Sequence, residues 1–250
     1  MGSSRMRDSN HEYERMRNVL AGMAAEVGLE TEVKVFAGPL KILDALGDPE
    51  EKDYPLQKGK EKLMEATVLN SRGQAYTDMY GNYQGTLSDV IALELKDNFQ
   101  RAVFVSTLNA LLRHRNKVEN TRHCKNEGMG QCGKEIVDYV KERYESPKIW
   151  LVGLQPRLLE NLSMHFQIRV TDKDSDNIGS EKNGVGIEDP SAAASEIGQW
   201  CDLIIATGTI FVNNTFEEIL SCSKPVILYG VTAAGPAHVL GIQRYCPQST

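Results

Sequence analysis

Long apolar runs are missing from this 250-residue sequence, and none approaches the roughly 18 residues that a membrane span requires. The N-terminal residues 1–17 are polar and lack the apolar core of a secretory signal. Basic charge is not in excess either, because 28 Lys and Arg residues are outnumbered by 34 Asp and Glu residues. A general nucleic-acid binder needs a basic face to neutralise phosphates. We therefore expect a cytoplasmic protein that binds neither nucleic acid nor membrane.

A disulfide framework and internal repeats are also missing. The five cysteines are an odd number and are spread widely, which favours reduced thiols. Hydrophobic residues make up 41% and charged residues 25% of the chain, as in an ordinary globular protein. The length suffices for one large or two small domains.

The first half of the chain mixes helical and strand-like patterns. Apolar residues recur at three- and four-residue steps over 11–27, which predicts a helix. Residues 98–115 are apolar nearly all round in their middle, which predicts a second, buried helix. Alternating patterns predict a strand near 31–38 and a hairpin that turns at residues 71–73, and a charged segment at 45–60 reads as a loop. These elements indicate an α+β domain over residues 1–115.

The second half has a different pattern. Short continuous apolar strands alternate with helices, which is typical of a parallel sheet covered on both faces. A long polar loop is expected to join the strand near 167–171 to the strand at 203–206. The fold class expected is α/β, with a Rossmann-like parallel-sheet domain over residues 116–250.

Small polar residues follow the strands of this second domain. Thr207, Gly208 and Thr209 come directly after an apolar strand, and Asn213 or Asn214 can cap the next helix. Gly153 and Asp172 follow two earlier strands. Because ligands of doubly wound sheets bind at the carboxyl ends of the strands, these residues are candidate ligand-binding residues. An ordinary strand-to-helix turn would explain the same residues equally well.

A second group of residues has the chemistry of metal ligands. His123, Cys124 and Cys132 lie within ten residues, and imidazole and thiolate bind soft and borderline metals. The spacing is not that of a zinc finger, and Cys132 also falls on the apolar stripe of its expected helix. These three residues are therefore candidate ligands of a transition-metal ion, with packing as the simpler explanation. His238, in a Gly/Pro-rich segment after the last expected strand, could reach the same cleft.

Several motifs together resemble one known family. They are GQAYTD (73–78), STLNAL (106–111), HCKNE (123–127), WLVGLQPRLLENL (150–162), CDLIIATGTIFVNNTFEEIL (201–220) and PVILYGVTAAGP (225–236). The chain is similar along nearly its whole length to the putative heavy-metal chelation family, a family of unknown function. The resemblance implies an N-terminal domain folded like that of enolase, an atypical Rossmann-like domain, and a site in the cleft between them. Ala233 and Ala234 stand where the family more often has a Ser/Thr-rich turn, which weakens any anion site built from that loop.

Three functions are compatible with these residues. One is a protein that handles a metal ion or metal chelate in the inter-domain cleft. The others are an enzyme and a non-catalytic binding module, each using a small-molecule cofactor or metabolite at the strand ends. No complete set of nucleophile, base and oxyanion donors is visible, so no reaction can be named. The sequence leaves open the identity of the ligand or metal and whether the chain forms a homo-oligomer.

Overall fold

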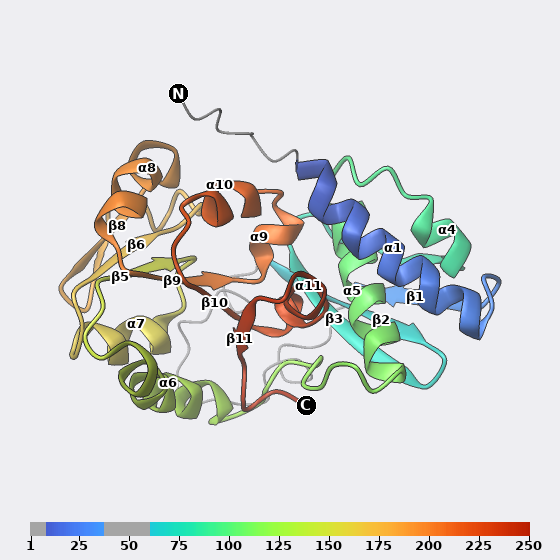
Figure 1. Cartoon of the computed structure of the whole chain (residues 1–250), viewed down its shortest axis with the longest axis horizontal. Helices are drawn as coiled ribbons and strands as arrows, with labels where there is room; N and C mark the ends of the chain where they lie inside the picture. The colour runs from blue at the N-terminus through green and yellow to red at the C-terminus, as the bar shows by residue number, and fades with distance from the viewer. Residues whose placement is uncertain (1–8, 38–60) are drawn as a thin grey trace.

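The structure, a computed structural model, describes residues 9–37 and 61–250. It contains a separate antiparallel sheet and a second, mostly parallel sheet, which lie side by side (Figure 1). The α/β fold class is therefore confirmed. The loop expected at 45–60 lies outside the described residues.

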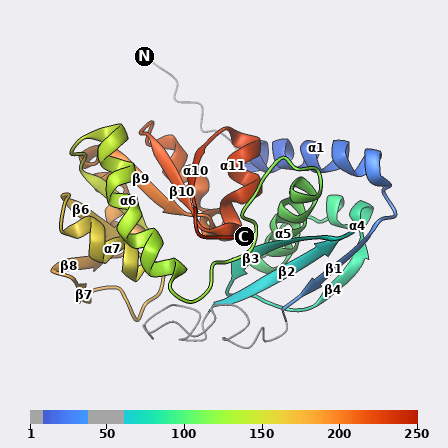
Figure 2. The ribbon, with the colours of Figure 1, turned by 90° about the horizontal axis from the view of Figure 1, so that it is seen from below.

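The antiparallel sheet comes from the first half of the chain and has the strand order β3-β2-β1-β4. Its strands are β1 (Glu32–Phe36), β2 (Lys62–Val68), β3 (Ser71–Thr77) and β4 (Tyr83–Thr86). The helices of this half are α1 (Ser9–Val27), α4 (Leu87–Ile91) and α5 (Asn98–His114). Helix α5 packs on β1, β2 and β3, and α1 packs on α4 and α5 (Figure 2).

The hairpin turn lies two residues earlier than the sequence pattern indicated. Val68 pairs with Ser71, so the turn consists of Leu69 and Asn70, and Leu69 adopts a φ of 53°. Gly73 lies within β3 and not in the turn. A glycine is needed at this position because the strand approaches α5 too closely for a side chain. A Cβ at this position would lie 2.3 Å from the backbone nitrogen of Ala110. The glycine therefore serves packing rather than the turn.

The second sheet has the strand order β11-β10-β9-β5-β6-β8-β7, and every adjacent pair except β7 with β8 is parallel. Its strands are β5 (Ile149–Val152), β6 (Ile168–Thr171), β7 (Glu181–Lys182), β8 (Val185–Glu188), β9 (Leu203–Thr207), β10 (Val226–Tyr229) and β11 (Gln243–Tyr245). The helical segments are α6 (Gly128–Tyr144), α7 (Pro156–Ser163), α8 (Pro190–Trp200), α9 (Thr209–Val212), α10 (Phe216–Ser221), the 3-10 turn η1 (Val231–Ala233) and α11 (Ala234–Leu240).

Helices cover both faces of this sheet, as the continuous apolar strands predict. Ile149 and Leu151 of β5 pack in one apolar cluster with α6 and α7. Trp150, between them, points to the opposite face and packs in the larger cluster with α8, α9 and α10. Figure 1 shows α6 and α7 on one side of the strands, with α8 and α10 on the other.

Two segments expected to be irregular are ordered elements. The polar stretch between β6 and β9 contains β7, β8 and α8, and α8 begins with Pro190 after Asp189, whose side chain caps the helix. The Gly/Pro-rich stretch after β10 forms η1 and α11. Pro236 is tolerated because it lies in the first turn of α11, where the missing N–H is not needed. Propensity alone did not indicate these elements, because Gly and Pro also fit loops.

One buried side chain joins the two sheets. Asn109 of α5 donates hydrogen bonds to the carbonyls of Gln74 (2.9 Å) and Val231 (3.1 Å) and accepts one from the backbone of Gly235 (2.6 Å). It is fully buried in the cluster shared by α1, α5, α9 and α11. The segment 231–235 is thus engaged in packing against α5.

No helix among the described residues is long and apolar enough to cross a membrane.

Candidate functional site

A large cavity opens where the two sheets meet. Its volume is about 960 Å³, and its walls include residues that follow β3, β5, β6, β9, β10 and β11. The chain runs outward from β5 through β6 to β8 and returns to β9 beside β5, so the strand order reverses between β5 and β9. Such a reversal is where ligands bind in open α/β sheets.

Gly153 forms the floor of the cavity next to β9. It has a φ of 83°, and a Cβ there would lie 2.7 Å from the methyl group of Thr207 and 3.1 Å from the Tyr229 hydroxyl. The Tyr229 hydroxyl donates to the Gly153 carbonyl at 2.8 Å. Burial raises the pKa of Tyr229 well above its ordinary value, so this phenol stays protonated. The carboxyl ends of β5 and β9, which the sequence analysis expected at one edge of the sheet, are therefore adjacent at Gly153 and Thr207.

Asp172 lines the cavity but is largely occupied by backbone. Its carboxylate accepts hydrogen bonds from the N–H of Leu154 (2.6 Å) and of Asp174 (2.7 Å). The side chain therefore ties the loop after β6 to the loop after β5. Each of its two oxygens already accepts one backbone hydrogen bond.

The segment after β9 is divided between the cavity and the core. Thr207, Thr209 and Asn213 line the cavity, whereas Gly208 and Asn214 are not among the described lining residues. A Cβ on Gly208 would lie 2.3 Å from the Ala233 nitrogen, so this glycine permits contact with η1. Asn214 is exposed with a φ of 55°.

The expected asparagine cap is absent. Asn213 ends α9, and Thr215 precedes α10 without a side-chain cap. The chain forms the short helix α9 directly after β9, because four buried residues there pack into the core. His238 lies exposed in α11 and is not among the described lining residues.

A polar network crosses the cavity wall between the two sheets. Asn98, at the start of α5, donates to Asp78 (2.7 Å) and to Asn213 (3.3 Å). Buried Arg101 donates to the Asn98 side-chain oxygen and to the Val212 carbonyl. Arg101 thus fixes the amide so that its NH₂ group points to the two acceptors.

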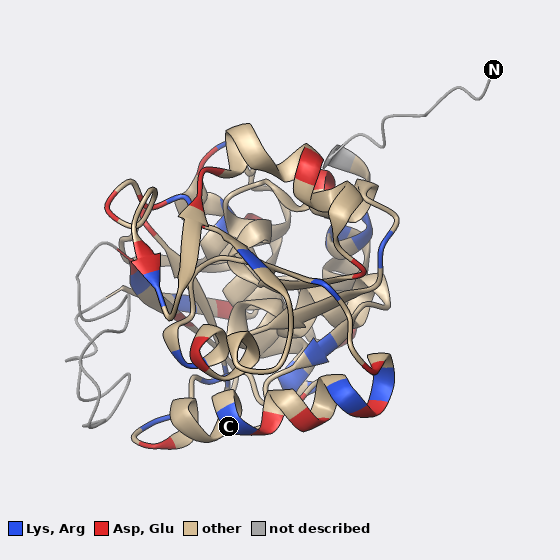
Figure 3. Ribbon diagram, turned by 90° about the vertical axis from the view of Figure 1, so that its left-hand side faces the viewer, with Lys and Arg blue, Asp and Glu red and all other residues tan. Residues whose placement is uncertain are grey.

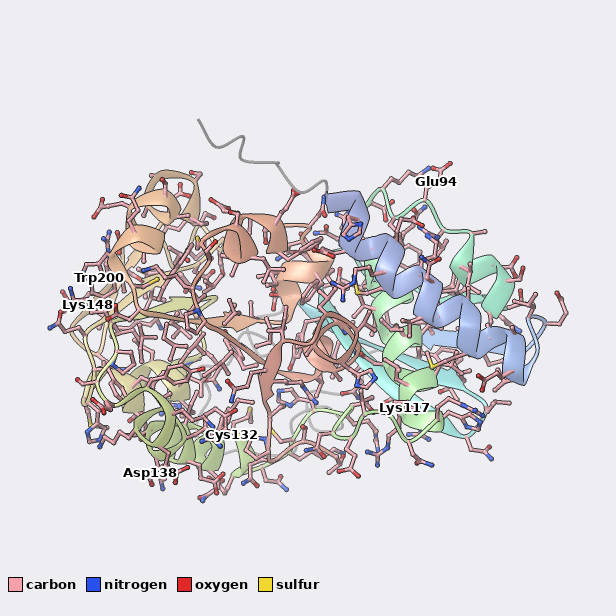
Figure 4. All side chains as sticks on the ribbon, in the orientation of Figure 1. Glu94, Lys117, Cys132, Asp138, Lys148 and Trp200 are labelled. Carbon is pink, nitrogen blue, oxygen red and sulfur yellow. The ribbon has the colours of Figure 1, made fainter. Side chains whose placement is uncertain are left out.

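Three cysteines line the same cavity. They are Cys124, Cys132 near the start of α6, and Cys246 directly after β11, and Cys246 packs against the small apolar cluster that contains Cys124. Gly128, at the start of α6, lets Cys124 pack against the helix, because a Cβ there would lie 3.0 Å from the Cys124 Cβ. Figure 4 labels Cys132 on the end of α6 nearest β11.

The two thiols on the α6 side of the cavity differ in exposure. Interaction with Cys132 and burial raise the pKa of Cys124, which is buried. Cys132 is half-buried and packs against the apolar cluster of α6 and α7.

His123 lies beside the thiols and is held in one orientation. Its Nδ1 lies 2.6 Å from the Cys124 carbonyl, and its ring contacts Tyr76 edge to face at 5.6 Å. Burial lowers the pKa of His123 to about 4, so the ring is neutral at pH 7. A carbonyl partner assigns the proton to Nδ1, which leaves Nε2 with a lone pair suited to a metal.

The cavity as a whole is acidic. Its described charged lining residues are Glu61, Asp78, Asp172, Lys173, Asp174, Asp189 and Glu218. Burial and three neighbouring carboxylates raise the pKa of Glu61 to about 7. Despite this density, the described residues include no group of three or more His, Cys, Asp or Glu side chains arranged to hold a metal ion.

Several residues of this cavity were not indicated by the sequence. Cys246 is more than a hundred residues from Cys132, and no local spacing connects them. Its position directly after a strand was the available clue, but β11 has only three residues and was not expected. Glu61 and Tyr229 were missed because only the strand order brings them to one cavity.

Comparison with known proteins extends this picture. Residues 135–240 match the family model described as putative heavy-metal chelation, DUF364. This confirms the resemblance that the motifs indicated. Gly153, Asp172 and residues 207–214 lie inside the matched segment, whereas His123, Cys124 and Cys132 lie outside it. No curated protein matches.

Two solved structures of this family are similar to the chain. One is a protein of unknown function from Pyrococcus horikoshii, with 13% identity, a TM-score of 0.52, and coverage of 88% of this chain and 78% of the other. The second is a protein of unknown function from Desulfitobacterium hafniense, with 14% identity, a TM-score of 0.49 and 72% coverage of each chain. At such low identity the first likeness shows the fold alone, and its coverage extends well beyond the segment that matches the DUF364 model.

Proposed function

We propose that this protein binds a metal complex, a transition-metal ion held partly by an organic chelator, in the cavity between the sheets. Cys124 and Cys132 would be the protein ligands, with Nε2 of His123 nearby. The observation that carries the proposal is that two reduced thiols, Cys124 and Cys132, line one cavity of about 960 Å³. The DUF364 match supports it at the level of the family.

The donor set favours a complex over a bare ion. Structural zinc sites in proteins use four protein ligands, and catalytic zinc sites use three. Here Cys124 and Cys132 line one cavity, and no group of three donors is arranged for an ion among the described residues. A chelator would supply the missing ligands and would fill space that one ion cannot.

The charge of the cavity further restricts which ligands we expect it to bind. Six carboxylates and one lysine are among its described lining residues, which favours a complex of net positive charge. On the side of the molecule shown in Figure 3, by contrast, acidic and basic residues are interspersed over the helices.

Titration with Cd²⁺ and with its cationic 2,2′-bipyridine complex tests the proposal. Thiolate coordination produces an ultraviolet charge-transfer band, which we expect with the complex at lower concentration than with Cd²⁺ alone. Cys124→Ser/Cys132→Ser should abolish the band. Cys222→Ser, which removes a thiol outside the described cavity wall, should leave it unchanged. Equal bands in the double variant and the parent would exclude these ligands.

The alternative is an organic ligand bound without metal at the strand ends. Gly153 and Thr207 at the point of strand-order reversal favour it. Calorimetry with bipyridine alone distinguishes the two functions, because only the alternative predicts binding that the cysteine substitutions do not affect.

A further inference from the structure

Asp78 and Asn213 are held side by side on the cavity wall, although they come from different sheets. Asp78 follows β3 of the antiparallel sheet, and Asn213 ends α9, which follows β9 of the parallel sheet. The amide nitrogen of Asn98 donates one hydrogen bond to Asp78 Oδ1 (2.7 Å) and one to Asn213 Oδ1 (3.3 Å). All three residues line the cavity. One nitrogen atom therefore joins a carboxylate and an amide across the boundary between the sheets.

Arg101 fixes this arrangement from the protein interior. Its buried guanidinium donates to the side-chain oxygen of Asn98 and to the carbonyl of Val212, the residue before Asn213. Its acceptors among the described residues are all neutral. A buried charge is costly unless it is hydrogen-bonded, so these contacts hold the cation in one position. Because the guanidinium can only donate, the Asn98 oxygen must face Arg101 and the Asn98 NH₂ group must face the two acceptors.

Two polar atoms of the pair remain available to a ligand. Asn213 accepts through Oδ1, so its Nδ2 carries two N–H donors, and Asp78 still has Oδ2 as an acceptor. Neither atom has a hydrogen-bond partner among the residues that the structure describes. The cavity wall thus offers one acceptor and one donor on neighbouring side chains.

This combination discriminates between ligand groups. A carboxylate would be repelled by Asp78, and an ammonium group would leave the Asn213 donors unpaired. A hydroxyl carries its donor and its acceptor on one atom, whereas the two protein groups belong to different residues. A primary amide or a lactam carries an N–H and a C=O side by side, which matches both protein groups.

We propose that Asp78 and Asn213 form an amide-recognition subsite, in which Asp78 Oδ2 accepts the N–H and Asn213 Nδ2 donates to the C=O of a primary amide or lactam on the organic ligand. Asn98 and Arg101 are positioning residues, because they hold the two groups and do not supply the free atoms. The inference rests on the proposed function only in placing an organic ligand in this cavity, since the subsite itself needs no metal ion.

Three small neutral probes test the subsite on the metal-free protein. Benzamide has the N–H and the C=O, acetophenone has a methyl group in place of the NH₂ group, and benzyl alcohol has only a hydroxyl. In ligand-observed NMR titrations, benzamide should bind at least about tenfold more tightly than either, because the others leave Asp78 or Asn213 without a matched partner. Equal affinities for benzamide and either of the others, or no binding of benzamide, would overturn the subsite.

Asp78→Asn exchanges the free acceptor for a donor while keeping an oxygen for Asn98. The preference for benzamide over acetophenone should therefore fall by at least about tenfold. Glu218→Gln removes one negative charge from the same cavity and should leave the preference unchanged. A preference that survives Asp78→Asn, or that falls equally in Glu218→Gln, would exclude Asp78 as the acceptor.

Asn213→Asp provides a gain of binding that misfolding cannot imitate. The substitution places a second acceptor beside Asp78, so the affinity for benzamidine, which has donors on both nitrogens, should rise at least about tenfold relative to benzamide. Asn214→Asp is the matched control, because it adds the same charge at an exposed residue that is not among the described lining residues. An equal rise in both variants would overturn the role of Asn213.

Failure of the subsite and failure of the proposed function have different signatures. Cys124→Ser/Cys132→Ser should keep the preference for benzamide, because neither thiol belongs to the subsite. Selectivity for benzamide without the Cd²⁺–thiolate band would refute only the metal-binding function. The band without selectivity for benzamide would refute only the subsite.

Discussion

Asn109 offers the sharpest test of how the two sheets hold together. Asn109→Ala leaves three buried backbone groups without their partner, namely the carbonyls of Gln74 and Val231 and the N–H of Gly235. A buried polar group left unsatisfied costs about 1–3 kcal/mol. Some relaxation is expected, so the free energy of unfolding should fall by about 4 kcal/mol, a large share of the 5–15 kcal/mol typical of proteins.

Ser106→Ala is the matched control. Ser106 lies one turn earlier in α5 and is equally buried, but its hydroxyl bonds only to the Val103 carbonyl of the same helix. Its loss should cost about 1 kcal/mol or less. Urea unfolding followed by circular dichroism, with calorimetry to detect a split transition, measures both variants. If Asn109→Ala costs no more than Ser106→Ala, the bridging role of Asn109 is wrong.

Three further outcomes follow from particular contacts. Gly208→Ala should lower the free energy of unfolding, measured with a chemical denaturant, by about 3 kcal/mol or more, because its Cβ would overlap the Ala233 backbone. Gly186→Ala, with open space around its Cβ, should change it by no more than about 0.5 kcal/mol. Similar losses in the two variants would contradict the close packing of Gly208 on η1. Glu61 has a folded pKa of about 7, above its ordinary 4.5, so the wild type loses stability as the pH rises between these values. As the pH rises over that range, Glu61→Gln should therefore become increasingly stable relative to the wild type. A difference in stability that does not depend on pH would contradict the raised pKa of Glu61. The folded pKa of His123, about 4, lies below its ordinary value of 6.5. The contribution of His123 to the free energy of unfolding is therefore present above pH 6.5 and is lost as the pH falls toward 4. The urea midpoint of His123→Gln should accordingly change less with pH across this window than that of the wild type.

The local pattern of the chain predicted much of the fold. The helix over 98–115 was evident because its apolar residues leave no polar face, and α5 is buried along most of its length. The parallel sheet was evident because β5, β9 and β10 are apolar on both sides. Short elements such as β8 and β11 were missed because three or four residues carry too little periodicity to separate a strand from a loop.

The candidate site divides in the same way. The sequence by itself determined which residues carry suitable chemistry, because thiol, imidazole and carboxylate groups are fixed by residue type and parallel strands place their following loops on one edge. Only the tertiary structure decided which of them meet. It brought Cys246 into the same cavity wall as Cys132 through the position of β11 at the sheet edge, placed Gly208 against η1 rather than in the cavity, and bonded the Asp172 carboxylate to backbone N–H groups. The physical reason is that residue chemistry and periodicity are local properties, whereas proximity depends on strand order and on how closely two sheets pack.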